Sequence, residues 1–363
     1  MDSITQLGHR PSGHPVHPSG AAKKIGYNLV LKVVCKAFGP PETLERIDVP
    51  PPTPDPNEVL VHIDAAGVGF VDGLMIQGLY QIKPQLPYAP GSEFSGVVTA
   101  LGADVSTLKV GDRVIGLSSG GAFADCLTIS ANALIPIPAN LDSSIAAGLW
   151  INYATALYGL RDCGHLQPGE NVLILGAAGG VGSAAISVAK AMGARVIAAA
   201  SSAEKRQAAL AYGADEVLDY SRPQWRDELK TLTQPRGLNL VYDPVGGDTA
   251  EPAFRSLAPG GRFLVVGFAS GTIPKLAFNL ALLKQASLIG VDWGGASRAN
   301  PSINIALLNT ILKWIENEQL IPAAVTTKPM HTFKEALEQQ LAGRILGKLV
   351  LLNTHELQDP STH

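Results

Sequence analysis

Short apolar stretches dominate the first part of the chain, and each ends at Gly, Pro, Asp or Ser. Stretches of this length, with such residues between them, predict short β-strands. A Pro-dense connector at residues 50–58 separates the first two. The stretches are LVLKVVCKA from residue 29, VLVHIDAAG from 59, EFSGVVTALG from 93, DRVIGL from 112, AFADCLTI from 122 and NALIPIP from 132. They predict a compact, β-rich domain.

From residue 142 the pattern changes to a helical period, over DSSIAAGLWINYATALYGLRDCG. Beyond Pro168, apolar strands alternate with helical stretches such as SAAISVAKAM and AEKRQAALAYG. Continuous apolar strands that alternate with helices predict a parallel sheet covered on both faces. The six strands are NVLILG, ARVIAAA, DEVLDY, LNLVYD, GRFLVVG and SLIGVDW. This half of the chain is therefore expected to form a doubly wound sheet.

The pattern divides the chain into two domains and two tails. We expect a β-rich domain from residues 29–150 and 298–353, a doubly wound domain from 151–297, a disordered N-terminal tail at 1–28 and a C-terminal tail at 354–363. The amphipathic stretches INIALLNTILKWIEN and HTFKEALEQQLAGR and the strand GKLVLL are expected to pack back on the first domain. The first 24 residues carry three basic residues and one acidic residue, so a weak mitochondrial transit peptide is the alternative for this tail.

Composition and charge narrow the class of protein. Apolar residues make up 46% and charged residues 16% of the 363 residues, which excludes disorder, coiled coil and collagen. The net charge of −3 provides no electrostatic footprint for nucleic acid or an anionic membrane surface. No apolar run approaches the roughly 18 to 20 residues that span a bilayer. We expect a cytoplasmic protein, with the mitochondrial matrix as the alternative, whose partners are small molecules.

A glycine-rich turn follows the first strand of the second half. The sequence GAAGGVG at residues 176–182 lies between that strand and an apolar-periodic helix, as in a dinucleotide-binding turn. There, glycines let backbone amides at a helix N-terminus approach a pyrophosphate. Ala177 stands at the first glycine of the usual motif, so the glycines alone would also fit an ordinary tight turn. The flanking elements favour the dinucleotide, with contacts from Ala178, Gly179, Gly180 and Val181.

The choice of nucleotide depends on the end of the second strand, about 20 residues further on. A carboxylate there would bind the ribose of NAD, but this chain has AASS at residues 199–202, followed by Lys205 and Arg206. The Ser201 hydroxyl and the Lys205 ammonium would accommodate a 2′-phosphate through charge-assisted hydrogen bonds. The cofactor is therefore expected to be NADPH. The alternative is that both cations belong to a solvated helix face.

Several motifs resemble the medium-chain dehydrogenase/reductase superfamily, in its zinc-independent quinone oxidoreductase branch. They are GAAGGVG, AAASSAEK, VYDPVGGD and LAPGGRFLVVGFASG, together with GLYQIKPQLPYAPGSEFSGVV, VGDRVIG and GAFADCLTI further upstream. The resemblance covers roughly residues 30–352. It implies an α/β fold with a GroES-like β-rich substrate domain, a Rossmann doubly wound parallel-sheet domain, and C-terminal elements that return to the first.

Zinc-dependent members of this family have a Cys near the position of Gly69 and a His at that of Ser92. Both ligands are missing here, as are the four clustered cysteines of the structural zinc lobe. Cys35, Cys126 and Cys163 lie far apart, so no tetrahedral zinc site can be built from them. The resemblance therefore implies hydride transfer without a metal, to a quinone or an α,β-unsaturated carbonyl.

Such a transfer places negative charge on the acceptor oxygen, and a hydrogen-bond donor there stabilises the transition state. Tyr80 is the candidate donor, because MIQGLY is similar to the stretch that carries the active-site tyrosine in enoyl thioester reductases of the superfamily. A packing role is the alternative for this residue. Relatives often have Asn at Gly69 and a second Tyr at Leu74, so the site is more apolar here.

The pocket and the remaining cofactor contacts complete the expected site. Phe70, Trp150, Tyr153 and Trp293 are candidate walls of the acceptor pocket, although aromatic residues at such spacing are also typical of a core. By resemblance, Tyr220 is a second wall of the 2′-phosphate site and Lys348 reaches the pyrophosphate. The ends of the fourth and fifth strands border the nicotinamide half, with Val245, Gly246, Gly267, Phe268 and Ala269. We interpret Asp72 as the N-cap of a helix that begins DGLMIQ, and His62 as facing solvent.

These expectations define a functional hypothesis and one competitor. The hypothesis is an NADPH-dependent reductase of quinones or activated alkenes, active as a homodimer in which the edge strands SLIGVDW of two sheets pair. The alternative is a catalytically weak NADPH-binding protein with a structural or redox-sensing role, as lens crystallins of this family suggest. Cofactor binding without acceptor-dependent oxidation would favour the alternative, because a bound nucleotide stabilises a protein with or without turnover.

Overall fold

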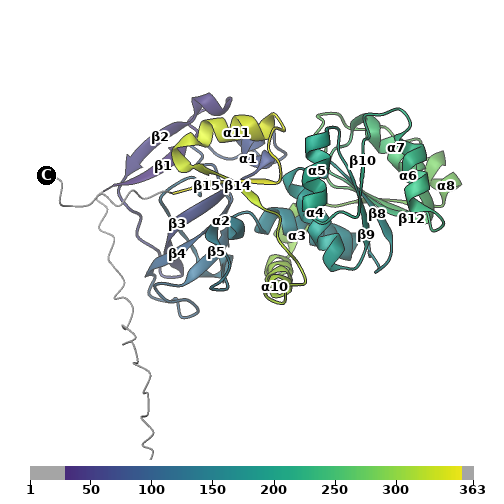
Figure 1. Ribbon diagram of the computed structural model, residues 1–363. Helices are drawn as coiled ribbons and strands as arrows, with labels where there is room; N and C mark the ends of the chain where they lie inside the picture. The colour runs from purple at the N-terminus through teal and green to yellow at the C-terminus, as the bar shows by residue number, and fades with distance from the viewer. Residues whose placement is uncertain (1–28, 354–363) are drawn as a thin grey trace, which may run out of the picture.

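The computed structural model describes residues 29–353, which form two lobes joined by helices (Figure 1). Both expected tails, and with them the transit-peptide alternative, lie outside the described residues. One lobe contains the N-terminal strands together with the last helix and strand of the chain, and the other contains the segment in between. No helix of the described part is long and apolar enough to cross a membrane.

The first lobe is built on a mainly antiparallel seven-stranded sheet, in which β14, β15, β3, β4, β5 and β7 are neighbours in that order and β6 pairs with β3. A two-stranded sheet of β1 and β2 lies beside it. The strands are β1 (Val30–Val34), β2 (Glu45–Val49), β3 (Glu58–Val68), β4 (Glu93–Leu101), β5 (Arg113–Leu117), β6 (Cys126–Ser130), β7 (Leu134–Pro136), β14 (Val325–Pro329) and β15 (Lys348–Leu352). The helices are α1 (Phe70–Ile76), α2 (Ser143–Ala146) and α11 (Phe333–Leu341), with 3-10 turns at Pro41–Thr43, Ala131–Ala133 and Met330–Thr332.

The second lobe is a six-stranded parallel sheet with the order β10, β9, β8, β11, β12, β13. Its strands are β8 (Asn171–Leu175), β9 (Arg195–Ala199), β10 (Glu216–Leu218), β11 (Leu238–Asp243), β12 (Leu257–Val265) and β13 (Ser287–Gly290). Its helices are α3 (Trp150–Leu157), α4 (Gly180–Ala191), α5 (Ala203–Ala211), α6 (Trp225–Thr233), α7 (Ala250–Arg255), α8 (Asn279–Lys284), α9 (Trp293–Ala299) and α10 (Ser302–Glu316), with a 3-10 turn at Gly247–Thr249.

The apolar runs of the sequence account for this second sheet. Every residue of β8 is buried, because α4 and α5 cover one face of the sheet and α6 and α7 cover the other (Figure 1). Apolar clusters fill both layers: one includes Val172 and Ile174 with α4, and the other includes Leu173 and Leu175 with α6 and α7. The expected doubly wound parallel sheet is confirmed.

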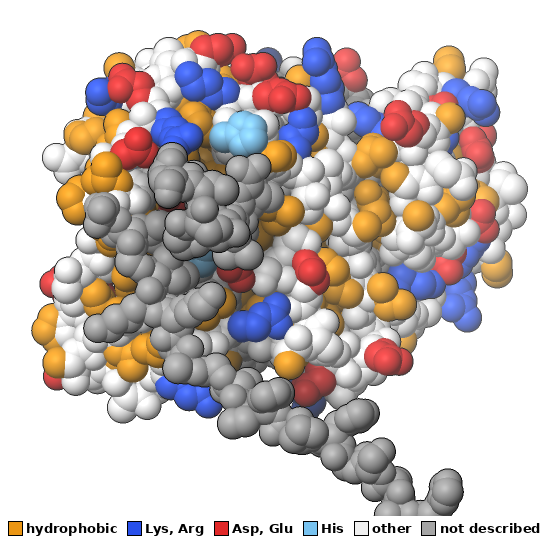
Figure 2. All heavy atoms as spheres, turned by 60° about the vertical axis from the view of Figure 1, so that its left-hand side comes forward, with side chains coloured by type: hydrophobic (Ala, Val, Ile, Leu, Met, Phe, Trp, Pro, Cys, Tyr) orange, Lys and Arg blue, Asp and Glu red, His pale blue; other side chains and the backbone are white. Residues whose placement is uncertain are grey.

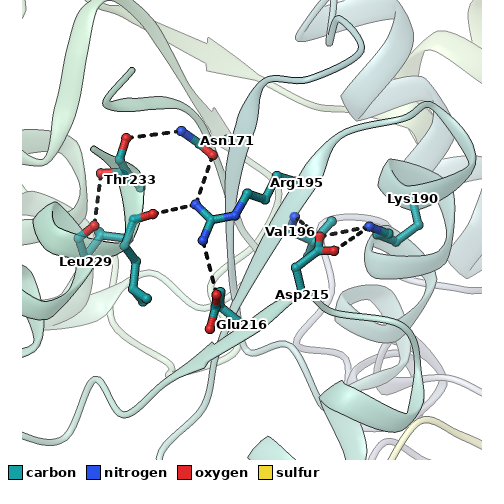
Figure 3. A network of polar contacts seen from close by, with 9 residues as sticks. Asn171, Lys190, Arg195, Val196, Asp215, Glu216, Leu229 and Thr233 are labelled. Carbon is teal, nitrogen blue, oxygen red and sulfur yellow. Dashed lines mark hydrogen bonds and ion pairs between the residues drawn. The ribbon is translucent and has the colours of Figure 1, made fainter. Parts of the chain in front are cut away.

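The amino ends of these strands are held by a polar network, shown in Figure 3. The Arg195 guanidinium donates to Asn171, to the carbonyl oxygen of Leu232 and to Glu216. Lys190 and Asp215 form an ion pair with a shortest N–O distance of 2.7 Å at the next connection. The glycine-rich turn and the neighbouring loops lie at the opposite edge of the sheet, where the strands have their carboxyl ends.

The segment that joins the two lobes is divided more finely than its sequence pattern predicts. The helical pattern from residue 142 is divided into α2, α3 and a π-helical segment at Tyr158–Cys163. The helix α10 packs against α3, and its apolar residues join an apolar cluster that extends from β5 and β7 of the first lobe to one face of the second sheet. The last elements, α11 and β15, pack into the apolar cluster of the first lobe (Figure 1).

Charged side chains are interspersed over the surface. On the face in Figure 2, acidic and basic residues alternate without a large area of one sign, apart from what the grey residues cover. This distribution agrees with the net charge of −3.

Candidate cofactor and active site

The glycine-rich turn lies at the carboxyl end of β8, where Gly176 has a φ of +58° and Gly179 caps α4. A Cβ on Gly182 would lie 2.3 Å from the carbonyl oxygen of Gly176, so only glycine allows the first turn of α4 to approach β8 this closely. The first amides of a helix have no intrahelical partner and favour an anion. The turn therefore fits the pyrophosphate of a dinucleotide.

Two neighbouring strand ends form the adenosine side of the turn. Ser201 follows β9 and is exposed, and burial raises the pKa of the nearby Tyr220 phenol against the lowering effect of the Ser201 hydroxyl. The Lys205 ammonium lies 3.3 Å from the carbonyl oxygen of Gly343. Arg206 instead pairs with Asp219 at 2.9 Å, so of the two cations in this helix turn only Lys205 lacks a carboxylate partner.

A feature that sequence reasoning missed is the loop after α11. The contact between Lys205 and Gly343 brings this loop to the adenosine side, and the next residue, Arg344, is exposed. Its position in a Gly-rich AGRILGK stretch was the available signal.

The ends of β11 and β12 close the other side of the turn. Val245 lies against the turn, because a Cβ on Gly176 would be 2.7 Å from its Cγ2. The Asp243 carboxylate accepts hydrogen bonds from the amides of Val245 and Gly246, at 2.8 and 2.9 Å. The two loops are joined by the Ala269 amide, which donates to Pro244. The structure thus brings the predicted group Val245, Gly246, Gly267, Phe268 and Ala269 together.

Lys348 is buried and forms an ion pair with Glu93, which is completely buried. Glu93 also accepts a hydrogen bond of 2.9 Å from the amide of Ile151, in the first turn of α3. Sequence reasoning missed Glu93, which lies in the GSE stretch next to Ser92. The charge of Lys348 is therefore neutralised within the protein, which leaves less of it for the predicted contact with a pyrophosphate.

The interpretation of Asp72 as an N-cap is wrong, because α1 begins two residues earlier, at Phe70. Gly69 is the N-cap, and Asp72, at the third helical position, accepts its amide at 2.8 Å. The Ser92 hydroxyl lies 3.3 Å from the other carboxylate oxygen. Burial raises the pKa of Asp72 to about 6, against the lowering effects of these hydrogen bonds and of Lys348.

The predicted pocket residues occupy different environments. Tyr80 follows α1 and is half-buried, and Phe70 and Trp293, which begin α1 and α9, are also partly exposed. Tyr153 is only 4% exposed, and its hydroxyl accepts a hydrogen bond of 2.7 Å from the amide of Ala323. Its side chain belongs to the apolar cluster that extends between the two lobes, so it offers a ligand almost no surface. Trp150 is buried in the same cluster.

The described residues hold no group of three or more His, Cys, Asp and Glu side chains placed to bind a metal ion. The histidine expected to face solvent, His62, is half-buried in β3.

A substrate lobe beside a parallel sheet with a dinucleotide turn is the architecture of a nicotinamide-dependent dehydrogenase or reductase. Comparisons with known proteins agree. A family model described as an alcohol dehydrogenase GroES-like domain matches residues 55–139, and one described as a zinc-binding dehydrogenase matches residues 180–309. Quinone oxidoreductase-like protein 2 of Rattus norvegicus is 38% identical over 88% of this chain and 91% of its own length. Quinone oxidoreductase of the same species is 31% identical over 90% of this chain and 99% of its own.

Solved structures give the same result. The Escherichia coli quinone oxidoreductase complexed with NADPH is 28% identical, with a TM-score of 0.79 over 89% of this chain and 99% of that one. The CurK enoyl reductase is 26% identical, with a TM-score of 0.80 over the same shares. The chain belongs to the medium-chain dehydrogenase/reductase superfamily, in its quinone oxidoreductase branch. It is an oxidoreductase of the quinone oxidoreductase and enoyl reductase type.

Proposed function

We propose that the protein is an NADPH-dependent reductase that transfers hydride, without zinc, to quinones or α,β-unsaturated carbonyls. The observation that carries this proposal is the arrangement at the carboxyl edge of the parallel sheet. There, the glycine-rich turn lies between Lys205 and Tyr220 on one side and the loops after β11 and β12 on the other. The Escherichia coli relative binds NADPH, which supports the choice of nucleotide.

Three groups of residues bind three different parts of the cofactor. The amides at the start of α4, from Gly179 to Val181, receive the pyrophosphate. Ser201, Lys205 and Tyr220 receive the 2′-phosphate, and the exposed Arg344 adds a second cation there. The loop residues Val245 and Phe268 border the nicotinamide half. When bound, the cofactor supplies a hydride at C4 of its nicotinamide ring.

The acceptor side is assigned to the first lobe and α9. The Tyr80 phenol donates a hydrogen bond to the acceptor oxygen as negative charge develops there. Phe70 and Trp293 form apolar walls that exclude water. Gly69 and Ser92 stand where zinc-dependent relatives carry the zinc ligands Cys and His, and neither supplies such a ligand. The Tyr80 hydroxyl therefore stabilises the negative charge on the acceptor oxygen in place of a zinc ion.

The test is NADPH oxidation with 9,10-phenanthrenequinone and with a 2-alkenal. Both acceptors are expected to be reduced, and Tyr80→Phe should lower kcat on the alkenal more than on the quinone, because quinones are intrinsically easier to reduce. NADPH binding without acceptor-dependent oxidation would reject the reductase and favour the structural or redox-sensing alternative. The expected cytoplasmic location is part of this proposal and is checked by fractionation of cells that produce the full chain.

We further propose that the protein is a homodimer paired through β13. This strand is the outer strand of its sheet, and its backbone groups on that side have no strand partner among residues 29–353. Exposed apolar side chains gather in the adjoining segment: Ile273, Phe278, Leu282, Leu283 and Leu288. An unpaired edge with an apolar surface beside it is typical of a two-fold interface between copies.

A further inference from the structure

One amide beside the glycine-rich turn has no partner of its own. Asn152 lies in the first turn of α3 and is 6% exposed. Within residues 29–353 its side chain makes no hydrogen bond. Polar side chains with so little exposure are ordinarily paired within the protein, whereas the atoms of this amide are unpaired and keep a small surface that a ligand can reach. The amide is therefore placed for a partner that is not part of the chain.

The direction of this amide is given by the glycines around it. A Cβ on Gly180 would lie 2.7 Å from Nδ2 of Asn152 and 3.4 Å from the carbonyl oxygen of Gly347. Gly180 is the first residue of α4, and the Gly347 amide donates to Ala178 of the turn at 2.7 Å. The Asn152 amide thus points at the N-terminus of a 12-residue helix, where unpaired backbone amides favour an anion.

The neighbours of Asn152 show why this amide is available while the nearby cation is not. Glu93 accepts the amide of Ile151 and pairs with Lys348, which follows Gly347 in the chain. This contact fixes the first turn of α3 and neutralises the Lys348 ammonium. Asn152 remains as the uncommitted donor on this side of the turn.

We propose that Asn152 binds the dinucleotide by donating a hydrogen bond from Nδ2 to its pyrophosphate, across Gly180. The proposal rests on the proposed function, since the ligand is that cofactor. A hydrogen bond from a neutral amide to a charged phosphate oxygen is stronger than one between neutral groups. It adds to the helix amides without adding a charge that would have to be buried in the free protein.

The experiment is calorimetric titration of the full chain with NADPH, NADH and ADP-ribose, all of which carry the pyrophosphate. Asn152→Ala should raise the Kd of all three by similar factors, about ten-fold or more. Asn152→Asp should raise them further, because it keeps the size but places a carboxylate beside the phosphates. The Tm of the ligand-free Asn152→Ala protein should match that of the wild type, since no hydrogen bond within the chain is lost.

Asn171→Ala is the matched control. Asn171 is 4% exposed but fully engaged: its side chain contacts Arg195 and the carbonyl oxygens of Thr233 and Gly237, at the opposite end of the sheet (Figure 3). This variant should lower Tm and leave all three affinities unchanged.

Unchanged affinities in Asn152→Ala, or an Asn152→Asp protein that binds as tightly as the wild type, would overturn the proposal. A loss for NADPH and NADH that spares ADP-ribose would also overturn it, by moving the contact to the nicotinamide half. If the wild-type protein binds none of the three ligands, the proposed function itself fails.

Discussion

At the scale of single residues, the Asp72 carboxyl is the group whose burial has a measurable consequence. Its pKa is raised from 3.8 to about 6, chiefly by burial. Between these two values the folded protein keeps a proton that the unfolded chain has lost. The free energy of unfolding therefore falls as the pH rises through this window, by about 3 kcal/mol in total, and is unaffected by this group above it.

Asp72→Asn should remove this contribution, because the amide oxygen can still accept from Gly69 but no longer titrates. The difference in free energy of unfolding between the wild type and this variant should therefore fall by about 3 kcal/mol from pH 4 to pH 7. At higher pH the difference should stay constant. Urea unfolding of both proteins across this range is the measurement. Parallel pH profiles would show that the carboxyl is solvated in the folded protein.

In the proposed function, Lys205 is the residue that selects NADPH over NADH. Its ammonium has a carbonyl oxygen as its neighbour and no carboxylate, so it is available to a 2′-phosphate. Lys205→Ala should raise the Kd of NADPH about ten-fold and leave that of NADH unchanged, because a charge-assisted hydrogen bond is lost only with the phosphorylated ribose. Fluorescence titration measures both, with the exposed Lys230→Ala as control. An equal loss for both nucleotides would refute the assignment.

A site residue can be predicted from the sequence when it belongs to a local motif, and not when its role depends on segments that only folding brings together. Lys205 stands at a fixed distance after the glycine-rich turn, so the motif locates it. Asn152 has no motif around it, and its importance comes from the close approach of Gly180 and Gly347, which only the folded chain provides. The start of the helix was predicted three residues too late, with Asp72 as its N-cap. The true N-cap, Gly69, has no side chain and so leaves no capping signal in the sequence.

At the scale of elements, the buried pair of Glu93 and Lys348 ties three segments together: β4, β15 and the start of α3. Removing one partner leaves an uncompensated buried charge, so Glu93→Gln and Lys348→Met should each lower the free energy of unfolding by about 3 to 5 kcal/mol. The double variant should lose much less than the sum, because neither charge remains. Denaturant unfolding of all four proteins forms a double-mutant cycle, and additive losses would contradict the pairing.

The parallel sheet was predictable because each strand is a continuous apolar run with its helix directly after it. The ion pair of Glu93 and Lys348 could not be predicted, since the two residues are 255 positions apart and neither belongs to a periodic pattern. The expected helix over residues 142–164 is interrupted between α2 and α3, close to Lys348. The chain turns at Gly148, where a Cβ would lie 2.9 Å from Cγ of Lys348.

At the scale of the whole molecule, several exposed apolar side chains gather in the segment that precedes β13. Phe278 is 89% exposed and Leu282 is 78% exposed, and both lie shortly before β13, the outer strand of its sheet, in the sequence. Side chains this apolar are ordinarily covered in a stable protein when they lie side by side. Pairing two copies about a two-fold axis would cover both areas at once and continue the sheet from one copy into the next.

A charge in this area should prevent that pairing. We expect Phe278→Asp combined with Leu282→Asp to convert a dimer into a monomer at micromolar concentration, because association would bury two unpaired carboxylates from each copy. Light scattering after size-exclusion chromatography measures the mass. Ile321→Asp is the matched control, since Ile321 is 79% exposed but lies after α10, away from β13 in the sequence. A monomeric wild-type protein, or a double variant that stays dimeric, would exclude β13 as the interface.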